Sequence, residues 1–171
     1  MTNTIIILTG VSGAGKTTVG KLLAQRLNSP FLDGDDFHSP DNIAKMERGE
    51  SLTDADRAPW VESLQECIET LLDNGQGAVV ACSALKAAYR EQLGGDRDRV
   101  KFVLLKGSYD LIQQRLKQRQ GHFMDDTLLD SQFDALEAPA DSLVVDVAPA
   151  PEAIVQTIVD CLNVTPAAHP Q

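Results

Sequence analysis

The chain has 171 residues, of which 25 are Asp or Glu and 15 are Lys or Arg, so its formal net charge is −10. A field of that sign repels phosphates and argues against a general nucleic-acid-binding protein or a protein of anionic membranes. The length predicts one domain, and a hydrophobic content of 43 % spread along the chain argues against disorder.

The N-terminal residues and the apolar runs predict where the protein resides. Residues 1–4 lack the basic stretch of a signal peptide, and no apolar run approaches the roughly 20 residues of a membrane span. No spacing of His and Cys suits zinc. We therefore expect a cytoplasmic protein with neither a nucleic-acid nor a membrane partner.

Short apolar runs alternate along the chain with helical patterns. The runs expected to form strands are residues 5–8, 78–82, 102–105 and 143–145, with residues 31–32 as a weaker candidate. Apolar residues recur at helical spacing in residues 19–27, 60–72, 111–119 and 154–162. This alternation predicts an α/β domain over residues 1–165 with a mostly parallel sheet, and residues 166–171 are expected to be a flexible tail.

Two stretches, residues 38–56 and 118–127, interrupt the alternation. The first is polar and contains Pro and Gly, which predicts an irregular insertion. Long insertions of this kind are often binding loops or lids, although both stretches could be ordinary surface excursions.

A glycine-rich segment between the first strand and the first helix matches the pattern G-x-x-x-x-G-K-[ST]. Its backbone N–H groups and the helix N-terminus are expected to bind phosphates. Lys16 is expected to reach the β- and γ-phosphates of a nucleotide, and the Thr17 hydroxyl to bind Mg²⁺. The nucleotide-binding candidates are Gly10, Val11, Ser12, Gly13, Ala14, Gly15, Lys16, Thr17 and Thr18.

Carboxylates follow the second predicted strand at Asp33, Asp35 and Asp36, with His38 close behind. Loops at the carboxyl ends of strands line the ligand crevice of an open α/β sheet. A phosphoryl transferase needs carboxylates there to orient Mg²⁺ and to accept the proton of the attacking hydroxyl. No apolar strand ends in the usual Walker-B aspartate, so Asp33 and Asp35 are the candidates. An acidic turn around Gly34 is the alternative.

Basic residues complete the candidate site. Asp56 is expected to be the N-cap of the long helix, which puts Arg57 in its first turn, where a cation is disfavoured unless an anion lies opposite. Arg57 would then bind a substrate carboxylate, or else pair with Asp54 at the surface. Arg115 and Arg119 lie four residues apart on one helix and could stabilise the transferred phosphoryl group, or be solvated cations.

Five further segments resemble the small P-loop gluconokinases, relatives of shikimate kinase and the nucleoside monophosphate kinases. These segments are Asp33–His38, Asn42–Met46, Leu52–Trp60, residues 81–90 with Lys86 and Arg90, and residues 122–139 with His122-Phe-Met124 and Leu136-Glu-Ala-Pro139. The similarity runs from Ile5 to about Leu162. Ser51 and Asp125 stand where this family more often has proline.

The resemblance implies transfer of the γ-phosphate of ATP, with Mg²⁺, to the 6-hydroxyl of D-gluconate. It also implies a three-layer fold like that of nucleoside monophosphate kinases, with a five-stranded parallel sheet, a substrate-binding insertion and a lid, and often a homodimer. The expected catalytic residues are Lys16, Asp35 and Arg119; Arg115 and Arg119 join the nucleotide site, and Thr17 and Asp33 hold the metal. Expected at the acceptor are Asp35, His38, Arg57, Lys86 and Arg90.

Two alternatives to gluconate phosphorylation remain. A kinase of another acceptor, such as a shikimate-like acid, a nucleoside monophosphate or adenylylsulfate, is the first; a second base would need an apolar pocket that the polar insertion does not offer. A nucleotide-gated switch is the second, but the N-K-x-D-like loop of GTP-binding proteins is missing.

Overall fold

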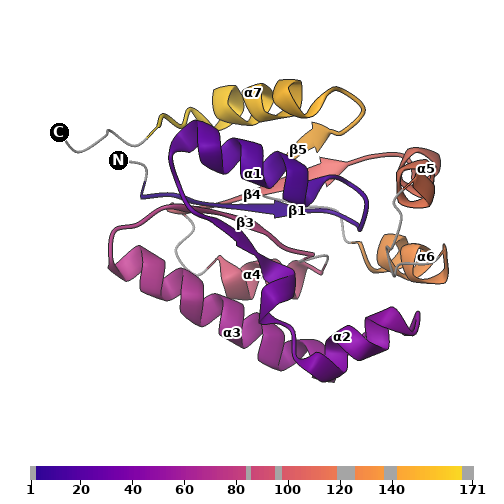
Figure 1. Ribbon diagram of the computed structural model, residues 1–171. Coiled ribbons are helices and arrows are strands. Elements are labelled where there is room, and N and C mark those ends of the chain that lie inside the picture. The colour runs from indigo at the N-terminus through magenta and orange to yellow at the C-terminus, as the bar shows by residue number, and fades with distance from the viewer. Residues whose placement is uncertain (1–2, 84–85, 95–97, 119–125, 137–141, 167–171) are drawn as a thin grey trace.

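The computed structural model describes residues 3–83, 86–94, 98–118, 126–136 and 142–166. Its elements in chain order are β1 (Ile5–Thr9), α1 (Lys16–Leu27), β2 (Phe31–Asp33), the 3-10 helix η1 (Gly34–Phe37), α2 (Pro40–Glu47), α3 (Asp54–Asp73), β3 (Ala78–Ala81), α4 (Ala87–Leu93), β4 (Val100–Lys106), α5 (Tyr109–Gln118), α6 (Asp126–Ala135), β5 (Leu143–Asp146) and α7 (Pro151–Leu162). The five strands pair in parallel in the order β2-β3-β1-β4-β5 (Figure 1). The predicted five-stranded parallel sheet is therefore confirmed. No helix among the described residues is long and apolar enough to cross a membrane.

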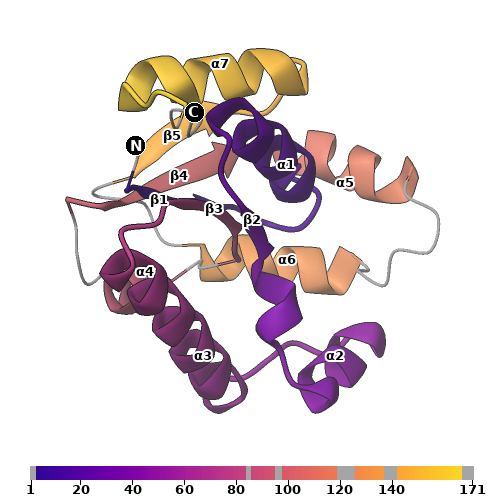
Figure 2. The ribbon, with the colours of Figure 1, turned by 60° about the vertical axis from the view of Figure 1, so that its left-hand side comes forward.

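The central strand β1 explains the layered arrangement. Ile6 and Leu8 point into a core shared with α1 and α7, whereas Ile5 and Ile7 point into a second core shared with α3. Both sets are fully buried. Helices α1 and α7 cover one face of the sheet, and α3 and α4 cover the other (Figure 2). A continuous apolar run is what a parallel strand buried on both faces requires.

The strand order also decides where a ligand can bind. After β1 the chain forms β2 and β3 on one side, and it later places β4 and β5 on the other. Open α/β sheets bind ligands where the order reverses, at the carboxyl ends of the strands. In Figure 1, α2, α5 and α6 lie at that end of the sheet, and both ends of the chain lie at the opposite end.

Helix α3 begins earlier than the sequence predicted. Thr53, rather than Asp56, is its N-cap: the Thr53 hydroxyl accepts from the Asp56 N–H at 3.1 Å, and the Asp56 carboxylate accepts from the Thr53 N–H at 2.9 Å. This reciprocal capping box satisfies two N–H groups, so it is more stable than a helix start capped by Asp56 alone. Pro59 consequently lies inside the helix, past its first turn.

Residues 38–56 contain a helix that the prediction of an irregular insertion missed. Ser39 caps α2, its hydroxyl accepting from the Asn42 N–H at 3.2 Å, and Pro40 occupies the first turn. Pro favours that position because its missing N–H has no helical partner there. Lys45 of α2 then pairs with Asp56 of α3 at 2.9 Å. The two helices are thereby held together.

Candidate active site

The glycine-rich loop joins β1 to the first turn of α1 and is tightly packed. Gly10 and Gly13 have positive φ angles of 141° and 83°. A Cβ at Gly10 would lie 2.7 Å from the Leu105 carbonyl oxygen, and one at Gly13 would lie 2.9 Å from Leu116 Cγ. Both positions therefore require glycine, and the loop lies directly against β4 and α5.

The N-terminus of α1 fits an anion. Gly15 is its N-cap, no side-chain cap is present, and the first turn carries no acidic residue. The first N–H groups of a helix without such partners attract phosphate. The Lys16 ammonium lies over the same loop and donates to the carbonyls of Gly10 at 2.7 Å and Val11 at 3.0 Å. Thr17 and Thr18 follow in the first turn.

The acidic turn η1 lies beside this loop. Asp33 ends β2, and its carboxylate accepts from the Asp35 N–H at 3.0 Å. The Asp35 side chain reaches solvent, yet the surrounding protein removes enough water to raise its pKa, as do the charges of Asp33 and Asp36. Lys16 acts in the opposite direction. The lysine of the phosphate loop therefore lies within electrostatic range of the acidic turn.

His38 is held against the same turn by Trp60. The two rings stack with centroids 4.5 Å apart and 10° between their planes. Trp60 is buried, and its Nε1–H donates to the Gly34 carbonyl at 2.7 Å. Burial, followed by the positive charge of Arg57, lowers the pKa of His38 to about 4. The imidazole is therefore neutral at pH 7.

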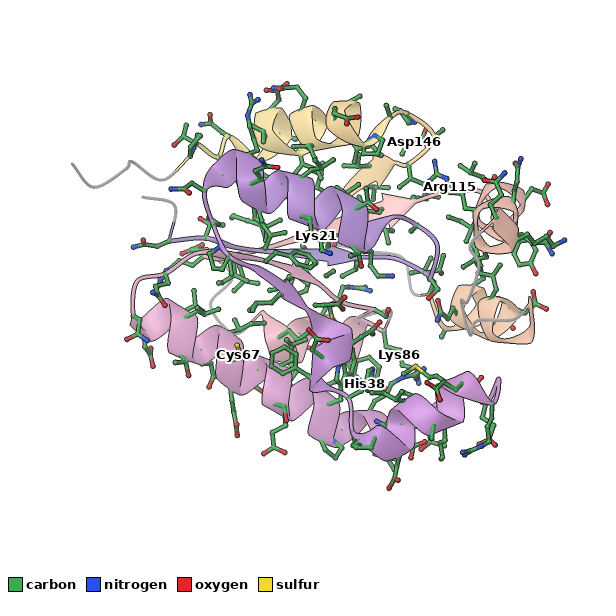
Figure 3. All side chains as sticks on the ribbon, in the orientation of Figure 1. Lys21, His38, Cys67, Lys86, Arg115 and Asp146 are labelled. Carbon is green, nitrogen blue, oxygen red and sulfur yellow. The ribbon has the colours of Figure 1, made fainter. Side chains whose placement is uncertain are left out.

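A charged cluster forms where the N-termini of α3 and α4 meet. Lys86 pairs with Asp54 at 2.8 Å, and the Tyr89 hydroxyl donates to the same carboxylate. These contacts lower the pKa of Asp54 and raise that of Lys86. Arg57 lies close enough to the Tyr89 hydroxyl to lower its pKa, against the effects of burial and of Asp54. Asp54 thus pairs with Lys86 and not with Arg57, and Figure 3 shows Lys86 and His38 in the region between α2 and the sheet.

A cavity of about 340 Å³ opens on the other side of the phosphate loop. It lies between the loop, α5 and the segment after β5, and among its lining residues are Gly13, Gly15, Thr18, Arg115 and Pro149. The Arg115 guanidinium donates to the Val147 carbonyl at 2.6 Å. This bond places a fixed cation at the rim of the phosphate loop.

Known proteins resemble this chain in both sequence and structure. A model of the shikimate kinase family matches residues 12–163. A gluconokinase of Arabidopsis thaliana is 45% identical over 94% of this chain and 93% of that protein. Among solved structures, a sugar kinase from a Janibacter species has a TM-score of 0.90 at 40% identity, covering 97% of this chain and 99% of the other. A gluconokinase from Sinorhizobium meliloti has a TM-score of 0.85 at 38% identity, covering 95% and 93%.

The chain belongs to the gluconokinase family. Within this gluconokinase-family fold, the structure brings the phosphate loop, Asp33, Asp35 and His38 to one end of the sheet. Arg57 lies near the start of α3, and Lys86 is the N-cap of α4. Arg90 is half-buried in α4, next to Tyr89. Arg119 and most of the predicted lid, residues 119–125, lie outside the described residues, as does the tail from residue 167.

Four residues of this gluconokinase-family site were not predicted in the role that the structure gives them. Asp54 and Tyr89 order the charged cluster, and Trp60 holds the acidic turn. The fourth is Gln132 of α6, whose carboxamide oxygen accepts from the Ser12 N–H of the phosphate loop at 2.6 Å, across 120 residues of sequence. All four belong to segments that carried the resemblance, but no local pattern marks them as ligands of these partners.

Thr17 and Asp33 are the residues expected to hold Mg²⁺. Among the described residues, no group of three or more His, Cys, Asp or Glu side chains is placed to hold a metal ion. Mg²⁺ in nucleotide sites commonly takes one or two protein oxygens and completes its shell with phosphates and water. The Thr17 hydroxyl at the start of α1 and the Asp33 carboxylate at the end of β2 fit that kind of site.

Proposed function

We propose that this chain is an ATP-dependent gluconokinase that transfers the γ-phosphate of ATP to the 6-hydroxyl of D-gluconate, giving 6-phospho-D-gluconate and ADP. One observation carries the proposal. The phosphate-loop lysine Lys16 lies within electrostatic reach of Asp35, and on this gluconokinase-family chain Arg57 of α3 acts on His38, three residues after that carboxylate. A phosphoryl donor and an anionic acceptor would meet there.

The donor side consists of the phosphate loop and the cavity next to it. Residues 10–18 would hold the phosphates of ATP through backbone N–H groups and Lys16. The cavity of about 340 Å³ would take the adenosine part, with Arg115 between the two. Thr17 and Asp33 would hold Mg²⁺, which when bound supplies positive charge that offsets the negative charge of the phosphates.

At the acceptor, Asp35 is the proposed base. The substrate hydroxyl oxygen forms a bond to the γ-phosphorus while the bond from that phosphorus to the ADP oxygen breaks, and the hydroxyl proton passes to Asp35. The nearby Lys16 ammonium would stabilise the charge on the transferred group. Arg119 is proposed to add to this stabilisation from the lid.

The cations would select a sugar acid. Arg57, Lys86 and Arg90 are proposed to bind the gluconate carboxylate, because charge-assisted bonds from guanidinium and ammonium groups to a carboxylate are short and strong. His38 would contact a hydroxyl of the same substrate. In the same proposal residues 38–56 form the acceptor-binding insertion and residues 118–127 the lid.

A coupled assay of ADP release tests the proposal directly. The purified chain is supplied with ATP, Mg²⁺ and, in separate reactions, gluconate, another aldonate, shikimate, AMP and adenylylsulfate. We expect turnover with gluconate and little with the others. Turnover only with a nucleotide acceptor, or with shikimate alone, would contradict the assignment.

Cellular location and oligomeric state also belong to the proposal. We propose that the enzyme is cytoplasmic and that, as the family resemblance implies, it is a homodimer. Light scattering of the purified chain measures the second point, and a monomer at assay concentrations would contradict it.

A further inference from the structure

Asn42 of α2 is a buried amide between two partners that belong to the acceptor side. Its side chain is 6% exposed. The amide nitrogen donates to the main-chain carbonyl of Asp56 in α3 at 2.8 Å and lies 3.3 Å from Nδ1 of His38. Because a carbonyl oxygen only accepts, the contact with Asp56 identifies which end of the amide is the nitrogen.

This orientation decides where the proton of His38 resides. The second N–H of the amide points at Nδ1, so Nδ1 must accept and carries no proton. In a neutral imidazole the single proton is then on Nε2. The stack on Trp60 and the bond from Trp60 to Gly34 keep the ring plane fixed beside the acidic turn.

We propose that Asn42 is a positioning residue that holds His38 as the neutral Nε2–H tautomer, so that His38 offers an uncharged hydrogen-bond donor to a hydroxyl oxygen of the acceptor. The inference rests on the proposed function for the identity of that acceptor. The hydroxyl groups of a polyol acid both donate and accept hydrogen bonds, so its site needs acceptors as well as donors. Asp33 and Asp35 only accept, and Arg57 and Lys86 are charged donors suited to the carboxylate, so a neutral donor at His38 supplies what a hydroxyl oxygen needs.

The charged groups around His38 agree with this assignment. Arg57 of α3 is the cation that acts on His38, and it disfavours a second positive charge on the imidazole. Asp35 and Asp36 lie on η1, and Lys45 of α2 is neutralised by Asp56. A charged imidazole would also lose the acceptor atom that the Asn42 amide requires, leaving a buried N–H without its partner.

The first measurement is ¹⁵N NMR of the full chain labelled at its histidines, of which there are three. His38→Gln assigns the signal by its loss. We expect the ¹⁵N shifts of an Nε2–H imidazole in the ligand-free protein at pH 7, and in Asn42→Asp, whose carboxylate accepts at Nδ1, we expect a change to the Nδ1–H or the charged form. An Nδ1–H imidazole in the unsubstituted chain overturns the inference.

A pair of His38 variants tests the donor in catalysis and does not depend on the Asn42 variant folding. The amide N–H of glutamine can reach the position of Nε2–H, whereas that of asparagine reaches only the position of Nδ1. We expect His38→Gln to keep the KM for gluconate close to its original value and His38→Asn to raise it by about three- to tenfold, the size of one neutral hydrogen bond. The KM for ATP should stay unchanged in both.

The role of Asn42 and His38 and the proposed function can be contradicted separately. Equal gluconate KM values in the two variants overturn the role of the Nε2–H donor while gluconate turnover stands. A chain that turns over no gluconate, yet shows the Nε2–H tautomer, overturns the proposed function and leaves the role of Asn42 in fixing the tautomer supported.

Discussion

The Lys16 ammonium contacts the phosphate loop and also acts on the acidic turn. It bonds the carbonyls of Gly10 and Val11, and its charge acts on Asp35. We expect Lys16→Ala to lower kcat by about 10²- to 10³-fold, the loss typical of one charge-stabilising donor. Circular dichroism should show an unchanged fold.

Lys21 supplies the matched control for Lys16. It is an exposed lysine on the same helix, and Lys21→Ala should leave kcat unchanged. Lys16→Ala with more than about a tenth of the original kcat would place the phosphoryl transfer elsewhere, since the expected loss is far larger.

Arg57 is expected to recognise the carboxylate of the substrate. Arg57→Ala should weaken gluconate binding by about 1.5–3 kcal/mol, the size of a hydrogen bond to a charged group. A polyol of the same length without the carboxylate should bind equally weakly to both proteins. Isothermal titration measures both ligands.

Arg48 is the control for Arg57. It is exposed and pairs with Glu50 at 2.8 Å, so Arg48→Ala should leave gluconate binding unchanged. If Arg57→Ala weakens the carboxylate-free polyol as much as gluconate, Arg57 has a structural role through Tyr89 and no carboxylate contact.

His38 makes stability depend on pH in a defined direction. Its pKa is about 4 in the folded chain, below the value of about 6.5 that it has when unfolded. As the pH falls from 6.5 to 4, the unfolded chain therefore takes up the proton first, and the free energy of unfolding decreases across that window. Urea titrations at several pH values should show a shallower dependence for His38→Gln. An identical dependence in the variant would show that His38 is not the group responsible.

At the scale of single elements, the capping box determines where α3 begins and contributes to its stability. Thr53 and Asp56 exchange hydrogen bonds at the start of the helix that carries Arg57 and Trp60. Thr53→Ala removes the hydroxyl acceptor and should lower the free energy of unfolding by about 1 kcal/mol. Thermal or urea unfolding measures the loss.

The same helix contains its own control. Thr70 lies near its C-terminal end, exposed, with its hydroxyl bonded to the Glu66 carbonyl one turn earlier. Thr70→Ala should change stability by less than about 0.5 kcal/mol, as surface substitutions usually do. Equal losses in the two variants would contradict the role given to the cap.

At the scale of the whole molecule, α5 and α6 approach the phosphate loop from regions remote in sequence. The rings of Tyr109 of α5 and Phe133 of α6 pack in a tilted arrangement with centroids 5.3 Å apart. The Gln132 side chain of α6 accepts from the Ser12 N–H, and Arg115 of α5 lines the cavity. Phosphoryl transfer to an alcohol must exclude water, since water would otherwise take the γ-phosphate. We therefore expect ATP and gluconate together to order this part of the molecule.

Hydrogen–deuterium exchange measures that ordering. Peptides covering residues 109–118 and 115–127 should gain protection with both ligands and gain less with ATP alone. A peptide from residues 62–73, in the C-terminal part of α3, serves as the reference and should not change. Unchanged exchange over residues 109–127 at saturating ligands would contradict a lid.

Much of the fold follows from patterns confined to short segments. Continuous apolar runs predicted the strands that are buried on both faces, because successive side chains of such a strand point in turn into the apolar layers above and below the sheet. The phosphate loop was predictable for the same reason, since its glycines, lysine and threonine all lie within one short segment of the sequence. The boundaries that went wrong, the cap at Asp56 and the missed helix α2, are places where local capping hydrogen bonds outweigh the apolar periodicity.

The acceptor side could be predicted only in part, because its residues meet through tertiary contacts. The sequence by itself determined the residue types: the carboxylates after β2, His38, and the cations Arg57 and Lys86. Only the tertiary structure decided their partners, pairing Asp54 with Lys86, turning the Asn42 amide toward Nδ1 of His38 and bringing Gln132 to Ser12. The physical reason is that hydrogen bonds and ion pairs depend on distance and direction between elements, and the packing of α2, α3, α4 and α6 around the sheet alone sets those.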